Sequence, residues 1–123
     1  MLSICDIEKT QRFLERAKGI LATGDFKVEK NYKNNAFDDE FPLKHEDKLQ
    51  ILRSLTVEDC FKIAPNDNLR YEEAEVYFFT KNAKLFSFGE EEIVALYLKM
   101  YITETKFGEM IVVISFHREG MYE

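Results

Sequence analysis

Four side chains that could act on a phosphodiester lie close together in the last third of the chain: Tyr97, Lys99, Ser115 and His117. An imidazole can take or give a proton near neutral pH, and a phenol can donate one or stack on a base. A lysine ammonium can hold an anion. If these side chains share one surface, the sequence predicts a patch that can transfer protons beside a bound anion.

A β-hairpin would bring these residues onto one surface. Residues 96–102 alternate between apolar and polar, which predicts a half-buried strand. Residues 110–116 begin with apolar side chains on both faces, which predicts a central or near-central strand. The intervening segment, Thr105 to Glu109, contains Gly108 and is typical of a three-residue hairpin loop.

The loop fixes the register of the two strands. If Thr105 and Glu109 close it, the core-facing pairs are Leu98–Phe116, Met100–Ile114 and Ile102–Val112. On the opposite face, Tyr97 then faces His117 and Lys99 faces Ser115. Directly opposed residues have Cβ atoms roughly 4.5–5.5 Å apart. A phenol, an ammonium, a hydroxyl and an imidazole would therefore share one patch of sheet.

Composition limits the class of protein. With 123 residues, 46% hydrophobic and 14% aromatic, the chain is expected to be one globular domain rather than a disordered segment. There is no secretory signal and no apolar run of about 20 residues, so we expect a cytoplasmic protein without a membrane partner. Cys5 and Cys60 are isolated, which predicts no zinc site, no disulfide framework and no cofactor.

The net charge of −6 is concentrated in one part of the chain. Residues 31–75 carry eleven acidic and six basic side chains, whereas residues 76–118 carry five of each. A nucleic-acid-binding protein usually has a basic surface. The acidity therefore lies outside the predicted hairpin, where the candidate site is expected.

The first half predicts helices. Ser3 and Asp6 form a capping-box pattern before an amphipathic helix from about residue 4 to 23. Residues 25–31 alternate and predict a short edge strand. Residues 32–41 are polar and predict a surface loop, and Pro42 precedes a predicted helix at about 43–54.

The middle of the chain predicts a short helix and then strands. Thr56 to Asp59 is a second capping box, which predicts a helix through Ala64 that ends at Pro65. The remaining expectations are a loop at 66–70, a strand at 75–80, a turn at 81–82, a short strand at 83–88 and a charged connection at 89–92. This order predicts an α+β fold with N-terminal helices packed on a mostly antiparallel C-terminal sheet.

Several short motifs follow one another in the second half: Leu55-Thr56-x-x-Asp59-x-x-Lys62, then Asp67, Tyr97-Leu98-Lys99 and Val113-Ile114-Ser115-Phe116-His117. In order and spacing they resemble the MqsR family of bacterial type II toxins, over about residues 50–119. The resemblance implies a single RelE-like domain over residues 1–123. It further implies an mRNA interferase, a metal-independent endoribonuclease whose partners are mRNA and a cognate antitoxin. The oligomeric state is open between monomer and homodimer.

The resemblance also assigns residues. The functional lysine of the family falls on Lys62, its strand tyrosine on Tyr97 and its basic residue after Ser-Phe on His117. We therefore expect these three as catalytic residues. From their chemical types, Lys99, Arg118 and Ser115 are expected to bind the substrate.

A second hypothesis is a non-catalytic RelE-like protein-binding module or degenerate toxin, whose acidic middle engages a basic partner. Ala74 stands where the family has a glutamine, which favours this hypothesis, as does the acidic charge. Each candidate also has an ordinary structural explanation. Lys62 would pair with Glu58 on a helix, and Tyr97 and His117 would be surface residues of a strand. The predicted Tyr97–His117 pair favours the nuclease.

Overall fold

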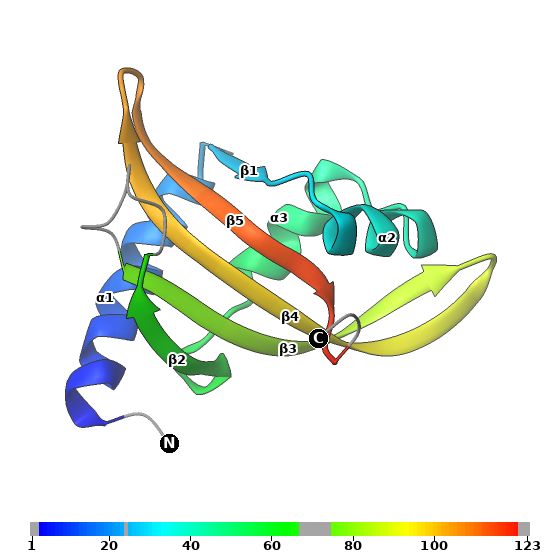
Figure 1. The fold of residues 1–123 in the computed structure, drawn as a ribbon, viewed down its shortest axis with the longest axis horizontal. Coiled ribbons are helices and arrows are strands. Elements are labelled where there is room, and N and C mark those ends of the chain that lie inside the picture. Colours follow the sequence, from blue (N-terminus) through cyan, green and yellow to red (C-terminus); the bar gives the residue numbers. More distant parts are fainter. Residues whose placement is uncertain (1–2, 24, 67–74, 121–123) are drawn as a thin grey trace.

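The computed structural model describes residues 3–23, 25–66 and 75–120. In chain order its elements are α1 (Ile4–Leu21), β1 (Phe26–Val28), α2 (Tyr32–Glu40), α3 (His45–Arg53), the 3-10 turn η1 (Val57–Asp59), β2 (Cys60–Pro65), β3 (Glu75–Ser87), β4 (Glu90–Thr105) and β5 (Gly108–Arg118). The strands form one five-stranded sheet in the order β1-β5-β4-β3-β2 (Figure 1).

The α+β class is confirmed, and the N-terminal helices pack on the C-terminal sheet. The sheet is mixed, however, rather than mostly antiparallel as expected. The edge strand β1 runs parallel to β5, while the other neighbouring strands are antiparallel. Because α2, α3 and three strands separate β1 from β5 in the chain, no tight turn imposes an antiparallel pairing.

Helix α1 forms where its apolar spacing predicted it. The Ser3 hydroxyl accepts a hydrogen bond from the Asp6 backbone N–H at 3.1 Å, which satisfies one donor of the first turn. The ring of Phe13 stacks on that of Tyr77 in β3, with centroids 3.9 Å apart. The predicted helix at 43–54 is confirmed as α3, which buries Leu49 and Leu52.

Helix α2 replaces the surface loop that the polar sequence predicted. Asn31 caps the helix by accepting a hydrogen bond from the Asn34 backbone N–H at 2.9 Å, as N-cap residues do. The helix has only a weak apolar stripe, and it is anchored by Phe37 and by Phe41 just beyond its end, both fully buried. Two phenylalanines and a buried asparagine hold α2 in place. Because so few apolar residues repeat at helical spacing, the sequence pattern did not predict this helix.

The second capping box forms only a single 3-10 turn, and the predicted helix through Ala64 is wrong. Asp59 accepts a hydrogen bond from the Thr56 backbone N–H at 2.8 Å, as a capping box requires. The chain then extends as β2 and pairs with β3. Pairing with β3 supplies hydrogen bonds that compete with the helical ones, and Lys62 consequently lies on an edge strand.

The predicted turn at Lys81 and Asn82 is also wrong, because β3 continues through both residues to Ser87. The Lys81 ammonium is held by the Asp59 carboxylate at 3.2 Å and by the Ser54 carbonyl at 3.1 Å, within a regular strand. The turn lies instead at residues 88–89, and the expected charged connection at 89–92 belongs largely to β4. The β3–β4 hairpin is therefore long, and its tip extends to one side of the molecule (Figure 1).

The two faces of the sheet differ in what covers them. One face packs against the helices and forms the main core, which includes Phe13, Leu21, Phe79, Leu98 and Phe116. The other carries a smaller apolar cluster drawn from strands alone: Val76, Phe78, Tyr101 and Val112, with Ala64, Tyr97, Met110 and Ile114 packed against it. We call this second surface the open face. Across the described residues, no helix is both long and apolar enough to cross a membrane.

Candidate functional site

The β4–β5 hairpin places the predicted pairs on the open face. Tyr97 lies opposite His117 and Lys99 opposite Ser115, as the register predicted. Nearer the turn the pairing differs by one residue, because Thr105 pairs with Gly108 and not with Glu109, and the predicted pairs of Met100 and Ile102 shift accordingly. The loop is therefore one residue tighter than expected.

A β-bulge restores the predicted register beyond this shift. Lys99 pairs with Ser115 and Met100 with Val113, so Ile114 is an extra residue in β5. Its carbonyl oxygen accepts hydrogen bonds from the side-chain amides of Asn31 and Asn34, both at 3.0 Å.

Asn34 also binds the strand beyond the bulge. Its side-chain oxygen accepts a hydrogen bond from the Phe116 backbone N–H at 2.8 Å, and the residue is 1% exposed. The start of α2 thus holds the strand that carries His117. Sequence reasoning missed Asn31 and Asn34; the only signal was their position before a pair of phenylalanines in an otherwise polar stretch.

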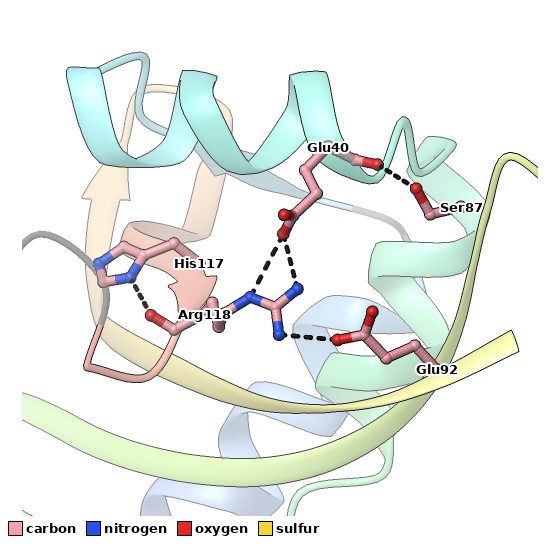
Figure 2. Close-up of polar contacts among 5 residues, drawn as sticks. All are labelled: Glu40, Ser87, Glu92, His117 and Arg118. Atoms are coloured by element: carbon pink, nitrogen blue, oxygen red, sulfur yellow. Dashed lines mark hydrogen bonds and ion pairs between the residues drawn. The ribbon is translucent and has the colours of Figure 1, made fainter. Parts of the chain in front are cut away.

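His117 lies beneath the surface of the patch. Its ring stacks on Tyr97, with centroids 5.4 Å apart and planes 18° apart, and it is only 1% exposed. Nδ1 donates a hydrogen bond to the carbonyl oxygen of Arg118 at 2.9 Å (Figure 2). A carbonyl can only accept, so the neutral ring carries its proton on Nδ1 and presents Nε2 as the basic nitrogen.

Two lysines from different strands flank the same aromatic ring. The ammonium of Lys62 lies 5.0 Å from the Phe78 ring centroid, and that of Lys99 lies 5.2 Å from it. Both positions are within the range of cation–π attraction. Neither lysine forms an ion pair within the parts of the chain that the structure describes. The expected helical pair of Lys62 with Glu58 is absent from the described residues because β2 is extended.

Phe61 adds an exposed aromatic ring to this surface. It is 47% exposed, and its centroid lies 6.1 Å from that of Tyr97 and 6.0 Å from that of Phe78. The sequence predicted a helix at this position, and Phe61 reaches this surface because residues 60–65 form β2 instead. We refer to Phe61, Lys62, Phe78, Tyr97, Lys99 and His117 together as the lysine–aromatic patch.

A hollow of about 530 Å³ adjoins the patch on the open face. Lys62 and Lys99 line it together with Glu29, which follows β1 at the sheet edge. The apolar part of its lining includes Val76 and Tyr101. The hollow therefore offers two cations, one carboxylate and an apolar surface beside the Tyr97–His117 pair.

Arg118 lies on the other side of the sheet. Its guanidinium binds the Glu40 carboxylate at 2.8 Å and the Glu92 carboxylate at 2.8 Å, and it lies 5.5 Å from the Phe41 ring centroid (Figure 2). The hydrogen bonds that Arg118 donates to Glu40, and then to Glu92, raise its pKa above the usual value. The structure does not bring this predicted substrate-binding residue to the patch. It joins the end of α2 to β4, and its carbonyl oxygen orients His117.

The remaining predicted residues divide as follows. Ser115 faces Lys99 on the open face and is half-buried. Asp67 and Ala74, together with most of the loop expected at 66–70, lie outside the described residues. Among the residues that the structure does describe, no three histidine, cysteine or acidic side chains gather in a metal-binding group.

Comparison with known proteins adds no relative. No protein-family model matches the chain, and neither a curated protein nor a solved structure matches it significantly. The geometry of the open face is therefore the basis for any statement about function.

Proposed function

We propose that this chain is a RelE-like toxin of the MqsR type, which cleaves mRNA without a metal ion and is neutralised by a cognate antitoxin. One observation carries the proposal: the stacked Tyr97–His117 pair lies beside two lysines that have no acidic partner among the described residues. They share the open face of the sheet. Aromatic rings interleaved with cations are the features that bind single-stranded RNA.

Binding would use the lysine–aromatic patch in two ways. Phe61, the most exposed ring of the patch, stacks on a base, which typically contributes about 1–3 kcal/mol per base. Lys62 and Lys99 hold neighbouring phosphates as point charges. The patch is basic although the whole chain has a charge of −6. Its local field therefore selects this surface for a polyanion.

The proposed reaction is transfer of the phosphoryl group to the 2′-oxygen. Nε2 of His117 takes the proton of the 2′-hydroxyl, whose oxygen attacks phosphorus as the bond to the 5′-oxygen breaks. The hydroxyl of Tyr97 protonates that leaving oxygen, and Lys62 and Lys99 stabilise the charge on phosphorus. The products are a 2′,3′-cyclic phosphate and a 5′-hydroxyl. Because His117 is 1% exposed, this reaction requires its imidazole to become accessible when RNA binds.

The experiment is cleavage of a single-stranded RNA in the presence of EDTA, with product ends identified by mass spectrometry. We expect His117→Gln and Tyr97→Phe to lower the rate by about 10²-fold or more. Lys62→Ala should weaken binding. Lys84→Ala is the matched control, since Lys84 is an exposed lysine of β3 outside the patch.

Folding of each variant is checked by circular dichroism, because His117 is buried. Expression of the wild type should arrest growth, and co-expression with the neighbouring reading frame should yield a stable complex. The nuclease assignment is wrong if the wild type leaves RNA intact, or if folded His117→Gln and Tyr97→Phe cut at the wild-type rate.

A second candidate function is a non-catalytic RelE-like protein-binding module. Two observations favour it: His117 is almost completely buried, and the Arg118 guanidinium is neutralised by Glu40 and Glu92. Under this hypothesis the wild type would neither cut RNA nor arrest growth, yet it would still bind its protein partner. The cleavage and co-expression experiments therefore separate the two functions.

A further inference from the structure

A second basic groove lies on the helix side of the sheet. It has a volume of about 350 Å³, and its lining comes from α1 and the facing strands: Lys9, Arg12, Phe13, Arg16, Glu75, Tyr77 and Ile102. Tyr77 and Ile102 belong to the main core, which faces the helices. The sheet therefore separates this groove from the lysine–aromatic patch.

Three cations line the groove from successive turns of one helix. Lys9, Arg12 and Arg16 are three and four residues apart, which places them on one face of α1. Lys9 pairs with Glu75 at 2.9 Å, and Arg16 pairs with Glu109.

Arg12, between them, forms no ion pair with any residue that the structure describes. The two existing pairs are about half-exposed, and such surface pairs are weak. The groove thus holds one guanidinium without an ion pair among the described residues, and two cations that can reorient toward a stronger anion.

The wall of the groove adds a hydrogen-bond donor. Tyr77 is 8% exposed and stacks on Phe13, so its ring has a fixed position. Burial, and secondarily the charge of Glu75, raise the pKa of Tyr77 above its usual value. Its phenol therefore stays protonated at neutral pH and can donate to an oxygen in the groove.

We propose that this groove binds a phosphate group. A phosphate ester presents several acceptor oxygens and up to two negative charges, which matches converging guanidinium and ammonium donors better than a single carboxylate does. Arg12 supplies the principal contact, and Arg16 and Lys9 close around the anion. The site is independent of the proposed RNA cleavage. Its phosphate comes either from a free nucleotide or from the backbone of an RNA strand.

The test is isothermal titration calorimetry of the full chain with 5′-AMP, with adenosine and with a short RNA that lacks terminal phosphates. We expect 5′-AMP to bind at least about tenfold more tightly than adenosine does. Arg12→Ala should lower the affinity for 5′-AMP about tenfold. Lys18→Ala, which removes an exposed cation from the same helix outside the groove, is the matched control. Lys84→Ala should also leave 5′-AMP affinity unchanged, since Lys84 is an exposed lysine outside both the groove and the lysine–aromatic patch.

The outcomes are distinct. If Arg12→Ala also lowers the affinity for the RNA, the bound phosphate is a backbone diester. If it lowers the affinity for 5′-AMP alone, the bound phosphate is a terminal ester. The proposal is overturned if 5′-AMP does not bind, if adenosine binds equally well, or if Arg12→Ala and Lys18→Ala have the same affinity. The titrations with 5′-AMP and adenosine do not depend on whether the chain cleaves RNA.

Discussion

Asn34 connects helix α2 to the strand that carries the candidate site. Its amide nitrogen donates to the carbonyl oxygens of Glu29 at 2.8 Å and Ile114 at 3.0 Å, and its oxygen accepts from the Phe116 N–H. A buried side-chain amide with three partners stabilises only while all of them are satisfied. Asn34 therefore fixes both the end of β1 and the bulge of β5.

Replacing this amide should be costly. We expect Asn34→Ala to lower the free energy of unfolding by about 3 kcal/mol, because it leaves buried backbone groups without partners. Asn34→Asp keeps the acceptor but turns a buried carboxylate oxygen toward the carbonyl oxygens of Glu29 and Ile114, so its effect should be at least as large. Asn35→Ala, at the exposed neighbouring position, should change stability by only about 0.5 kcal/mol or less. Urea denaturation measures all three, and equal effects at Asn34 and Asn35 would contradict this role.

Two buried acids should make the fold sensitive to alkaline pH. Burial raises the pKa of the Cys60 thiol and of the Tyr77 phenol in the folded state. The folded chain then keeps these protons longer than the unfolded chain, so stability is complete below the unfolded pKa values and declines as pH rises through them.

We expect the melting temperature to be level near neutral pH and to fall above about pH 8.5, where an unfolded thiol ionises. A second decline should follow near the pKa of an unfolded phenol, about 10. Cys60→Ala should remove the first decline. The thiol does not control this decline if the melting temperature rises through the pH range of thiol ionisation. The same conclusion follows if Cys60→Ala gives an identical dependence of melting temperature on pH.

Among the elements, the β3–β4 hairpin carries strain at its tip. Phe88 has φ +52° and is 98% exposed, and Gly89 follows with φ +82°. Positive φ at both central residues defines the two-residue turn whose twist matches that of the flanking strands. The sequence Asn-Gly is preferred in this turn. Phenylalanine gains no burial at this position to offset the left-handed backbone.

Phe88→Asn should therefore stabilise the protein, by about 1 kcal/mol. Phe86→Asn is the control, because Phe86 is also exposed, at 65%, but lies in the regular strand. We expect Phe86→Asn to be neutral or destabilising, since asparagine is a poor strand former. Thermal denaturation distinguishes the two, and destabilisation by Phe88→Asn would indicate that the phenylalanine makes a stabilising contact.

Elements with strong periodicity were predictable, whereas those held by single contacts were not. The stripe of α1 and the alternation of β4 each identify a buried face over many residues. Helix α2 depends on Asn34 and two phenylalanines, and β2 depends on its neighbour β3. A capping box starts a helix only if the residues after it form helical backbone hydrogen bonds. Residues 60–65 form hydrogen bonds with β3 instead.

The candidate site was predicted in part. The Tyr97–His117 pair follows from the hairpin, although the predicted loop was one residue too long and the bulge at Ile114 compensated for the error. The side of Arg118 was predictable from alternation, since it follows His117 directly. The burial of His117 and the position of Phe61 depend on packing across the sheet, which no local pattern encodes.

At the scale of the whole molecule, the lysine–aromatic patch presents two cations in a chain of charge −6. If RNA binds there, few counterions are released, so affinity should depend only weakly on salt. For two phosphate contacts by Lys62 and Lys99, the logarithm of affinity should fall with the logarithm of salt at a slope of about −1.4.

Fluorescence anisotropy with a labelled RNA at several salt concentrations measures this slope. Lys99→Ala should reduce its magnitude by about 0.7, the share of one phosphate contact on a single strand. Lys84→Ala, which removes an exposed lysine outside the patch, should leave the slope unchanged. A wild-type slope several times steeper would mean that further cations contact the RNA, and those of α1 would be the first to test.

The bulge at Ile114 also affects how this protein can change through insertions and deletions. Ile114 and Ser115 share one paired position, so loss of Ile114 would leave His117 on the open face and Arg118 on the helix side. Loss of Ser115 would have the same outcome, with Ile114 facing Lys99 in its place. A deletion one step later, at Phe116, would instead exchange the sides of the imidazole and the guanidinium. The hairpin can thus shorten at the bulge without inverting its chemistry, while the neighbouring residues tolerate no such change in length.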